Sequence, residues 1–579
     1  MENDYKTAMR TILCGHADAA MENSTVTVCG WVNKTRDHGN LIFIDIRDRS
    51  GIVQVFSNDK SIASLLSDLR LEDVVQITGT VRKRPDEMIN REIPTGEIEI
   101  ECINLKVLSK SSVPPFVVED KVKASENLRL KYRYLDLRRP TMQKMLKKRS
   151  DTYKAMRDYL TDKGFMEIET PIMSRSTPEG ARDYIVPSRV HPGKFYALVQ
   201  SPQLYKQLLM VSGIDRYFQF ARCFRDEDLR ADRQPEHTQI DMEMSFVEKE
   251  DIFRIVEGLI KYTFSSVIDT EVNIPFPVMS YHEAMERFGT DKPDLRFALE
   301  LIDITAKARA SDSNILKDNE YTGGIFIEEN VSRKEIDILT DFMKSAGAAG
   351  LGYIKVKEEK NSGPFSKFLD IDDLFNSQEG VFFIMSGKRR RTQEYLGMLR
   401  NRIAAMKNIR RNNDFNFLWV TDFPLFDWDE EEEKYEPFHH LFTMPSKQYI
   451  GKIAENPLAV TGELYDLVCN GVELASGSIR IHQYDIQKEV MEIIGIGEEE
   501  LEDKFGFLME AFKYGAPPHG GIAPGLDRLI MTMMGLDNIR DAIAFPKTLN
   551  AVGLMEDCPS SVEKKQTDEL HIIIKEDEE

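Results

Sequence analysis

The chain has 579 residues, of which 41% are hydrophobic and 30% charged, and its formal net charge is −21 at pH 7. These proportions exclude a disordered or fibrous protein, and the length corresponds to about four domain-sized units. The acidic balance also excludes a protein that coats nucleic acid with a uniformly basic surface, so any RNA must be bound locally.

The cysteines and the N-terminus limit the class of protein further. Six cysteines lie far apart and form no CxxC pair, so neither a disulfide framework nor a zinc site is expected. The first residues are charged, and no uncharged run approaches the roughly 18 residues that span a bilayer. We therefore expect a soluble, cytoplasmic protein without a membrane partner.

The N-terminal part of the chain has the pattern of a small β-barrel. Short strands are predicted at residues 25–31, 41–47, 52–56, 74–81 and 97–107, with a helical spacing at 62–71. Five strands with a helix between the third and fourth are typical of the OB fold, which commonly binds oligonucleotides. A purely structural β-domain is the alternative.

A second domain follows the linker at Pro114-Pro115. A helix is predicted from Pro140 to Gly164, followed by a strand at 165–172 that Pro171 interrupts. Residues 286–415 then alternate short strands (324–327, 351–356, 381–385) with helices (333–345, 392–406). This pattern predicts an inserted α/β module that splits the second domain.

Two polar clusters precede the insertion. Ser201-Pro202-Gln203 has the pattern of a helix start and places Gln203 and Lys206 on one face, although an exposed amphipathic helix would look the same. Residues 239–246 alternate strictly, so one strand face carries Gln239, Asp241, Glu243 and Ser245. Four arginines could neutralise this face in a salt-bridge ladder or hold phosphates instead: Arg222, Arg225, Arg230 and Arg233.

Two more clusters follow the insertion. Asp466 and Glu473 could hold a magnesium ion beside nucleotide phosphates, since a hard cation must lie between like charges. Residues 520–529 form a glycine-rich strand end that opens into a helix with Arg528 in its first turn. Because an arginine there opposes the helix dipole, a polyphosphate could account for it. The chain contains neither a P-loop nor a GxGxxG fingerprint.

In this order the clusters resemble the three signature motifs of class II aminoacyl-tRNA synthetases, and the chain resembles their bacterial-type aspartyl-tRNA synthetase branch. Further matching segments are residues 31–33, 43–45, 132–138, 177–183, 200–210, 224–227, 291–296, 525–528 and 544–548. The resemblance implies an α+β multidomain protein with an OB-fold barrel, a catalytic antiparallel sheet flanked by helices, and an inserted α/β domain. The expected ranges are OB domain 1–112, hinge 113–137, catalytic domain 138–285 and 416–555, insertion 286–415, and C-terminal extension 556–579.

The resemblance also implies an activity. Such enzymes activate L-aspartate with ATP and magnesium, release pyrophosphate, and transfer aspartate to the 3′ end of tRNA(Asp). They act as homodimers, and Pro171 would lie at the dimer interface. No zinc is expected.

Site residues follow from the matching motifs. Aspartate would be bound by Glu179, Ser201, Gln203, Lys206, Asp241, His439, His440 and Arg480. ATP would be bound by Arg225, Asp226, Glu227, Gln234, Glu473, Gly525, Leu526, Asp527 and Arg528, with Arg225 and Arg528 catalytic. Magnesium would be held by Asp466 and Glu473. The anticodon would meet Arg36, Phe43, Gln54 and Glu99.

A few positions depart from the family pattern. Leu441 replaces a proline, and Ala475-Ser476 replaces two glycines, but no charged group is lost. At position 38, histidine is often found in relatives that charge both tRNA(Asp) and tRNA(Asn), and leucine in those that charge only tRNA(Asp). The glycine that tends to accompany this histidine is replaced here by Glu87. The range of tRNAs is therefore open at this stage.

Two rival functions remain. A tRNA-independent ligase of the same fold would need no OB domain, so the barrel and Phe43 with Gln54 disfavour it. A non-catalytic RNA-binding paralogue would be expected to have lost Arg225, Glu473 or Arg528, and all three are present.

Overall fold

The fold is described from a computed structural model, which describes residues 5–37, 41–177, 180–358, 360–375, 378–409 and 415–575. The chain divides into two compact units. The first comprises Met1–Ser150, Leu229–Gln234 and Leu536–Ser561; the second comprises Asp151–Asp228, Pro235–Gly535 and Val562–Glu579. The six domain ranges expected above remain a prediction.

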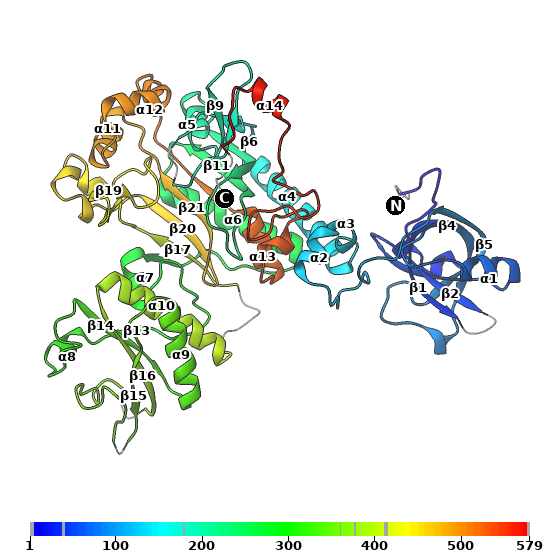
Figure 1. Ribbon diagram of the computed structural model, residues 1–579, viewed down its shortest axis with the longest axis horizontal. Coiled ribbons are helices and arrows are strands. Elements are labelled where there is room, and N and C mark those ends of the chain that lie inside the picture. The colour runs from blue at the N-terminus through cyan, green and yellow to red at the C-terminus, as the bar shows by residue number, and fades with distance from the viewer. Residues whose placement is uncertain are drawn as a thin grey trace. The chain divides into compact units, whose positions relative to one another are not determined.

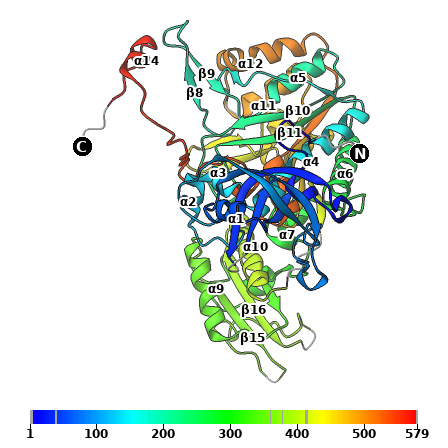
Figure 2. The ribbon, with the colours of Figure 1, turned by 90° about the vertical axis from the view of Figure 1, so that its right-hand side faces the viewer.

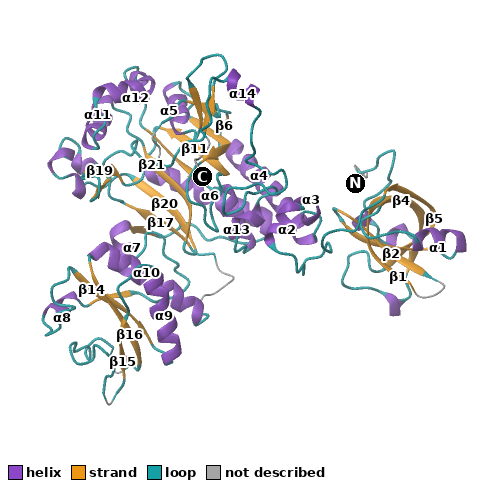
Figure 3. Cartoon of the chain, in the orientation of Figure 1, coloured by secondary structure: helices purple, strands orange, loops and turns teal. Residues whose placement is uncertain are grey.

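The first unit contains the predicted barrel, which is closed and has the strand order β1-β2-β3-β5-β4. Figure 3 shows it as strands with the helix α1 at its side. Its core is built from alternate strand residues such as Val28, Ile44, Val53 and Ile100. The elements are β1 (Thr25–Asp37), β2 (Ile42–Asp48), β3 (Gly51–Phe56), α1 (Lys60–Ser67), β4 (Val74–Lys83) and β5 (Ile98–Ser109). Helix α1 begins earlier than predicted because the Asp59 side chain accepts from the amides of Ser61 and Ile62.

A buried arginine ties the two sequence-distant parts of the first unit together. Arg133 is 2% exposed and donates to the carbonyl oxygens of Arg540, Ile543 and Ala544 at 2.8–3.0 Å. Its remaining nitrogen donates to Asp136 at 2.6 Å. The matching segment 132–138, which contains α3 (Arg133–Asp136), and the segment 544–548 thus contact one another through Arg133. Helix α2 (Glu126–Lys131) precedes the first segment and α4 (Pro140–Asp162) follows it.

The second unit is built on an eight-stranded sheet, part of which is visible in Figure 1. Its order is β12-β17-β20-β21-β22-β11-β10-β6, and the pairs are antiparallel except at the two edges. These strands are β6 (Met166–Glu167), β10 (Arg216–Phe224), β11 (Glu236–Ser245), β12 (Val278–Ser280), β17 (Phe417–Thr421), β20 (Leu464–Cys469), β21 (Val472–Ile479) and β22 (His519–Pro524). This confirms the predicted antiparallel catalytic sheet.

Helices and two smaller sheets complete the second unit around this sheet. The helices are α5 (Gln203–Val211), α6 (Lys249–Ile268), α11 (Tyr484–Ile493), α12 (Glu498–Phe512), α13 (Leu526–Met534) and α14 (Lys564–Glu569). The small sheets contain β7 (Met173–Ser174), β8 (Ile185–Pro187) and β9 (Phe195–Leu198), and β18 (Phe426–Asp429) with β19 (Lys434–Pro437). Of the predicted strand at 165–172 only β6 forms, and β7 begins just after the range, because Pro171 has no amide to donate to a ladder.

The inserted segment forms its own sheet within the second unit. Strands β13 (Leu301–Asp303), β14 (Tyr321–Ile327), β16 (Gly380–Gly387) and β15 (Gly352–Val356) pair antiparallel in that order. Helices α9 (Arg333–Ser345) and α10 (Arg389–Met406) pack on one face, as Figures 1 and 2 show, and α8 (Thr305–Arg309) packs on the other. Helix α7 (Tyr281–Phe288) lies against α10. The predicted strands and helices of this module are confirmed.

Candidate active site

The acidic face of β11 is buried and carries two carboxylates, one of which, Asp241, was predicted to bind aspartate. Asp241 and Glu243 are both 0% exposed. Lys206, on α5, places its Nζ 3.0 Å from Asp241 Oδ1 and 3.3 Å from Glu243 Oε2. Arg480, just after β21, donates through Nε to Glu243 Oε1 at 2.9 Å and through Nη2 to Oε2 at 3.3 Å. Two cations and two carboxylates therefore meet in a space closed to water.

This arrangement corrects one expectation. The arginines at 222, 225, 230 and 233 were candidates to neutralise the acidic face, whereas Lys206 and Arg480 do so. Arg222 instead donates to Glu236 at 2.6 Å on the exposed part of the strand pair. The sheet order places β22 beside β11 and β21 beside β22, so Arg480 reaches Glu243 from that side, whereas Arg222 lies near the end of β10 on the other side of β11.

The charges in the pocket fix the protonation of their neighbours. Burial alone would raise the pKa of Glu243, but Arg480 and Lys206 outweigh it, so the pKa is lowered. Burial, followed by the Arg480 charge, holds the pKa of His440 well below its usual value. His440 accepts a hydrogen bond from Arg480 at 2.8 Å. The pocket thus contains an ionised carboxylate and a neutral imidazole beside Arg480.

A glycine on the neighbouring strand makes room for this ion pair. Gly521 on β22 lies opposite Glu243 in the antiparallel register. A Cβ at Gly521 would lie 2.0 Å from Glu243 Oε2, closer than any real contact. Part of the glycine-rich sequence after residue 519 is therefore required by the buried carboxylate.

The other residues predicted for aspartate make local contacts within the second unit. The Ser201 hydroxyl accepts from the amide of Gln203 at 3.2 Å, and the helix begins at Gln203, one residue later than its sequence suggests. The buried Gln203 side chain donates to Gln207. The ring of His439 stacks on Phe438 and contacts Phe423. Glu179 lies outside the described residues.

A pocket opens near Ser201, between β7, β9 and the start of α5. Its lining combines polar and apolar side chains. The lining residues are Ser174, Arg175, Thr177, Asp183, Ala197, Leu198, Val199, Gln200, Ser201, Leu204 and Tyr205. It therefore adjoins the predicted aspartate site from the side of the 177–183 segment.

The two arginines predicted to bind phosphates converge at one end of the sheet. Burial, followed by the charges of Arg225 and Arg528, lowers the pKa of His237 to about 3. Both arginines therefore act on the same imidazole. Within the described residues the half-buried Arg225 guanidinium has no carboxylate partner. Arg528 donates to the carbonyl oxygen of Glu473 at 2.8 Å.

The residues predicted for magnesium lie on the β20–β21 hairpin. Asp466 is 1% exposed, and among described residues its Oδ1 has no hydrogen-bond partner. Burial, followed by the Glu473 charge, raises the pKa of Asp466. For Glu473 the effect of burial is outweighed by Lys292 and Arg528, so its pKa is lowered. Two oxygen-donor carboxylates, one with an unsatisfied buried oxygen, suit a hard cation.

These two carboxylates are not a complete metal site by themselves. In the described ranges no three His, Cys, Asp or Glu side chains are grouped so that they could hold a metal ion. Additional oxygen ligands, such as nucleotide phosphates, would be needed. All six cysteines are free.

The remaining nucleotide residues have mixed roles in the structure. Gln234 pairs through its amide with the backbone of Lys547. The Asp527 carboxylate accepts from the amide of Thr238 at 2.8 Å, and Leu526 is fully buried. Other residues lie at strand ends or in the loop after β10: Asp226, Glu227 and Gly525. The side chains of Gln234, Leu526 and Asp527 are therefore already engaged by the protein.

The four predicted anticodon residues are brought together on the barrel. Arg36 donates to Gln54 Oε1 at 2.9 Å, and Gln54 donates to Glu99 at 2.7 Å. Phe43 lies opposite Arg36 in the β1–β2 register and stacks on Phe56 with ring centroids 6.0 Å apart. This face offers an aromatic surface beside polar groups. His38 lies outside the described residues.

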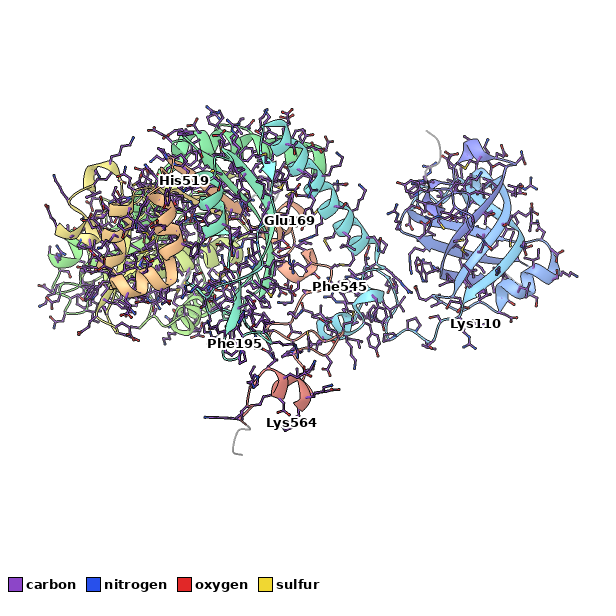
Figure 4. The ribbon with its side chains drawn as sticks, turned by 90° about the horizontal axis from the view of Figure 1, so that it is seen from above. Lys110, Glu169, Phe195, His519, Phe545 and Lys564 are labelled. Atoms are coloured by element: carbon purple, nitrogen blue, oxygen red, sulfur yellow. The ribbon has the colours of Figure 1, made fainter. Side chains whose placement is uncertain are left out.

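Three features of the site were missed at the sequence level. Glu243 pairs with both Lys206 and Arg480. The strict alternation of residues 239–246, which placed Glu243 on the acidic face, was the sequence signal that could have identified it. Lys292 lies 3.5 Å from Glu473, and its motif was noted without a role. His519, labelled in Figure 4, is fully buried and accepts from Gln207 at 3.2 Å; no sequence pattern indicated it.

Apolar side chains are exposed around Pro171. Phe195, on β9, lies at the periphery of its unit in Figure 4. The exposed apolar residues on β6 to β9 and beside Pro171 are Met166, Ile172, Met173, Ile185, Phe195 and Tyr196.

Among the described helices, none has both the length and the apolar run needed to cross a bilayer.

Known proteins resemble both parts of the chain. Residues 125–549 match the family model for tRNA synthetases class II (D, K and N), and residues 26–108 match the OB-fold nucleic acid binding domain. A protein of Caldanaerobacter subterraneus subsp. tengcongensis, called aspartate–tRNA(Asp/Asn) ligase, is 52% identical over 98% of each chain. A protein of Treponema denticola with the same name is 48% identical over 98% of this chain and 99% of its own.

Solved structures show the same fold at low identity. Asparaginyl-tRNA synthetase from Pyrococcus horikoshii, complexed with asparaginyl-adenylate, has a TM-score of 0.60 and 19% identity over 93% of this chain and 98% of its own. A putative aspartyl-tRNA synthetase from Leishmania major also has a TM-score of 0.60 and 19% identity, over 94% and 96%. On the family match and the nearly full-length relatives, this chain belongs to the class II tRNA synthetases of the D, K and N group.

Proposed function

We propose that the protein is an aspartate–tRNA ligase. The observation that carries this proposal is the buried group of Lys206 and Arg480 with Asp241 and Glu243. The side-chain carboxylate of L-aspartate would meet the two cations. Asp241 Oδ2, which has no hydrogen-bond partner among described residues, would accept the α-ammonium.

The same group accounts for selection against asparagine. A neutral amide would leave Lys206 and Arg480 with less negative charge in a site that excludes water. Unpaired buried polar groups cost about 1–3 kcal/mol each, and more when charged. Sites built to pair a specific polar group reject analogues that lack it.

In the first step a carboxylate oxygen of aspartate attacks the α-phosphorus of ATP, and the bond to pyrophosphate breaks. Arg225 would bind the α-phosphate and Arg528 the γ-phosphate, so charge on the transferring group is neutralised as it develops. Asp466 and Glu473 would hold magnesium, which supplies charge neutralisation for the phosphates when bound. In the second step the 3′-hydroxyl of tRNA attacks the activated carbonyl carbon and AMP leaves.

The first test is aspartate-dependent exchange of pyrophosphate into ATP. We expect exchange with L-aspartate and none with L-asparagine, and we expect Arg225→Ala or Arg480→Ala to lower it by orders of magnitude. Arg222→Ala is the matched control, because this arginine lies on β10, three residues before Arg225, and pairs with Glu236 at the surface. Intact exchange in both site variants would refute the site assignment.

A second candidate function is the charging of tRNA(Asn) with aspartate as well. It is favoured by the relatives at 48–52% identity, which are called aspartate–tRNA(Asp/Asn) ligases, and by His38, the residue that the family resemblance associates with charging of both tRNAs. Purified tRNA(Asp) and tRNA(Asn) should be charged side by side, with His38→Leu for comparison. An unchanged ratio in the variant would remove His38 from the proposal.

The remaining expectations are part of the same proposal. The exposed apolar residues around Pro171 would form the interface of a homodimer, and the enzyme would act in the cytoplasm. The OB domain would comprise 1–112, the hinge 113–137, the catalytic domain 138–285 and 416–555, the insertion 286–415, and the extension 556–579. Light scattering of the purified protein should give twice the chain mass of 66.5 kDa.

A further inference from the structure

Lys292 connects the inserted domain to the nucleotide site. It lies in the segment that leads from α7 into the inserted sheet, between Gly289 and Leu301. Its Nζ is 3.5 Å from Glu473 Oε2 and 3.7 Å from Asp291 Oδ2. Its side chain remains 43% exposed, so the ammonium contacts the magnesium-site carboxylate and can still reach a ligand.

The charges around Lys292 favour an anionic ligand that brings its own cation. Glu473 has Lys292 at 3.5 Å and Arg528 Nη1 at 3.9 Å. Asp466, across the same hairpin, retains a buried oxygen without a partner in the described part of the chain. An ATP–metal complex fits both features, because its phosphates suit the ammonium and its metal suits the carboxylates.

The segment that carries Lys292 packs against the hairpin that carries Asp466 and Glu473. Gly471, in the turn of this hairpin, has φ +84°, and a Cβ there would lie 3.2 Å from Asp294 Cβ. The return from the inserted domain contacts the same turn, since the amide of Asn416 donates to Asn470 Oδ1 at 3.0 Å. Both connections to the inserted domain therefore support the β20–β21 turn.

The inserted domain itself fixes the Lys292 segment. Arg400, on α10, is fully buried and donates through Nη2 to the carbonyl oxygens of Asp294 and Phe297 at 2.8 and 2.9 Å. Its guanidinium also lies 4.0 Å from the centroid of the Phe297 ring. A helix of the insertion thus determines where the backbone after Lys292 runs.

We propose that Lys292 is a positioning residue of the nucleotide site, through which the inserted domain takes part in ATP binding. Its ammonium holds the Glu473 carboxylate in the nucleotide-free protein and attracts the polyphosphate when ATP arrives. This inference rests on the proposed function, in which ATP is a substrate.

The proposal predicts that removal of the Lys292 charge changes the affinities for ATP and for a free divalent cation in opposite directions. A positive charge near the site favours a polyphosphate and opposes a bare divalent cation. Two unit charges about 4 Å apart interact more strongly where water is partly excluded than in bulk water. Removing the charge should therefore change each affinity by about tenfold, weakening that for ATP and strengthening that for the cation.

The experiment compares Lys292→Met with Lys292→Arg, which keeps the charge, and with Lys334→Met, which removes an exposed charge from α9 of the inserted domain. Mn²⁺ binding to the nucleotide-free protein is measured by calorimetry, and KM and kcat for ATP are measured in aspartate-dependent exchange. In Lys292→Met we expect Mn²⁺ to bind about tenfold more tightly and KM for ATP to rise about tenfold, with kcat nearly unchanged. Lys292→Arg and Lys334→Met should resemble the unmodified protein.

The other outcomes each exclude something specific. If both affinities weaken together in Lys292→Met, the residue is structural and the proposal is wrong. If neither changes, Lys292 does not belong to the site. If the unmodified protein shows no aspartate-dependent exchange, the proposed function fails, and the Mn²⁺ titration alone then decides whether Lys292 shares the carboxylate with a cation.

Discussion

Replacement of Glu243 by glutamine is the sharpest test of the buried charge group. The substitution keeps the size of the side chain but removes the negative charge that pairs with Arg480 at 2.9 Å and Lys206 at 3.3 Å. All three side chains are nearly or fully buried. Breaking a buried ion pair by removing one partner costs about 3–5 kcal/mol, because the remaining charge is left uncompensated.

Calorimetric unfolding of the variant provides the measurement. For a large domain, 1 kcal/mol corresponds to about 2 °C in Tm, so the catalytic unit should melt about 6–10 °C lower. Glu236→Gln is the matched control on the same strand, since Glu236 pairs with Arg222 at the surface, where an ion pair is worth about 0–1 kcal/mol. L-Aspartate should restore part of the lost Tm, because it brings a carboxylate to the two cations.

The pH dependence gives the prediction a sign. The folded-state pKa of Glu243 is lowered from 4.5, so this carboxylate contributes stability above that pH and loses the contribution as the pH falls through the folded value. The difference in Tm between the unmodified protein and Glu243→Gln should be at its full size at pH 7 and should become smaller below about pH 4.5. A Tm loss no larger than that of Glu236→Gln at pH 7, or a difference that grows on acidification, would contradict this account.

Three further predictions test other parts of the chain. Gly471→Ala should lower stability by about 1–3 kcal/mol, measured by urea unfolding, because φ is positive there and the new Cβ would meet Asp294; unchanged stability would show that the turn can relax. Phe43→Ala should weaken tRNA charging and leave aspartate-dependent exchange intact, whereas equal losses in both assays would rule out an anticodon role for that face. Arg133→Met should speed proteolysis near Ala544 by leaving buried carbonyls unpaired, and identical cleavage rates would mean that this clamp is dispensable.

Local patterns in the sequence were enough to predict several elements of the fold. The strict alternation at 239–246 placed Asp241 and Glu243 on one face, because the side-chain period of a strand depends only on neighbouring residues. The same holds for the five barrel strands and for the helix that starts at Pro140. Boundaries shifted by a few residues where a side chain such as Asp59 caps a helix.

The partners within the site could not be predicted from spacing. Lys206 is 35 residues from Asp241, and Arg480 is 237 residues from Glu243. Such pairs depend on strand order and register, which no local pattern determines. For this reason the nearby arginines were considered as partners, and Lys292, which is 181 residues from Glu473, received no role.

The charge arrangement explains how an acidic protein can bind two anionic substrates. A dicarboxylic amino acid and a polyphosphate both need cations, yet buried cations without partners would destabilise the free protein. Here Arg480 pairs with Glu243, and Lys206 pairs with both Asp241 and Glu243. Lys292 lies against Glu473 in the proposed nucleotide site. In the proposed mechanism, internal carboxylates would keep these cations in place until a ligand shares them, so acidic residues would be part of the machinery for binding anions.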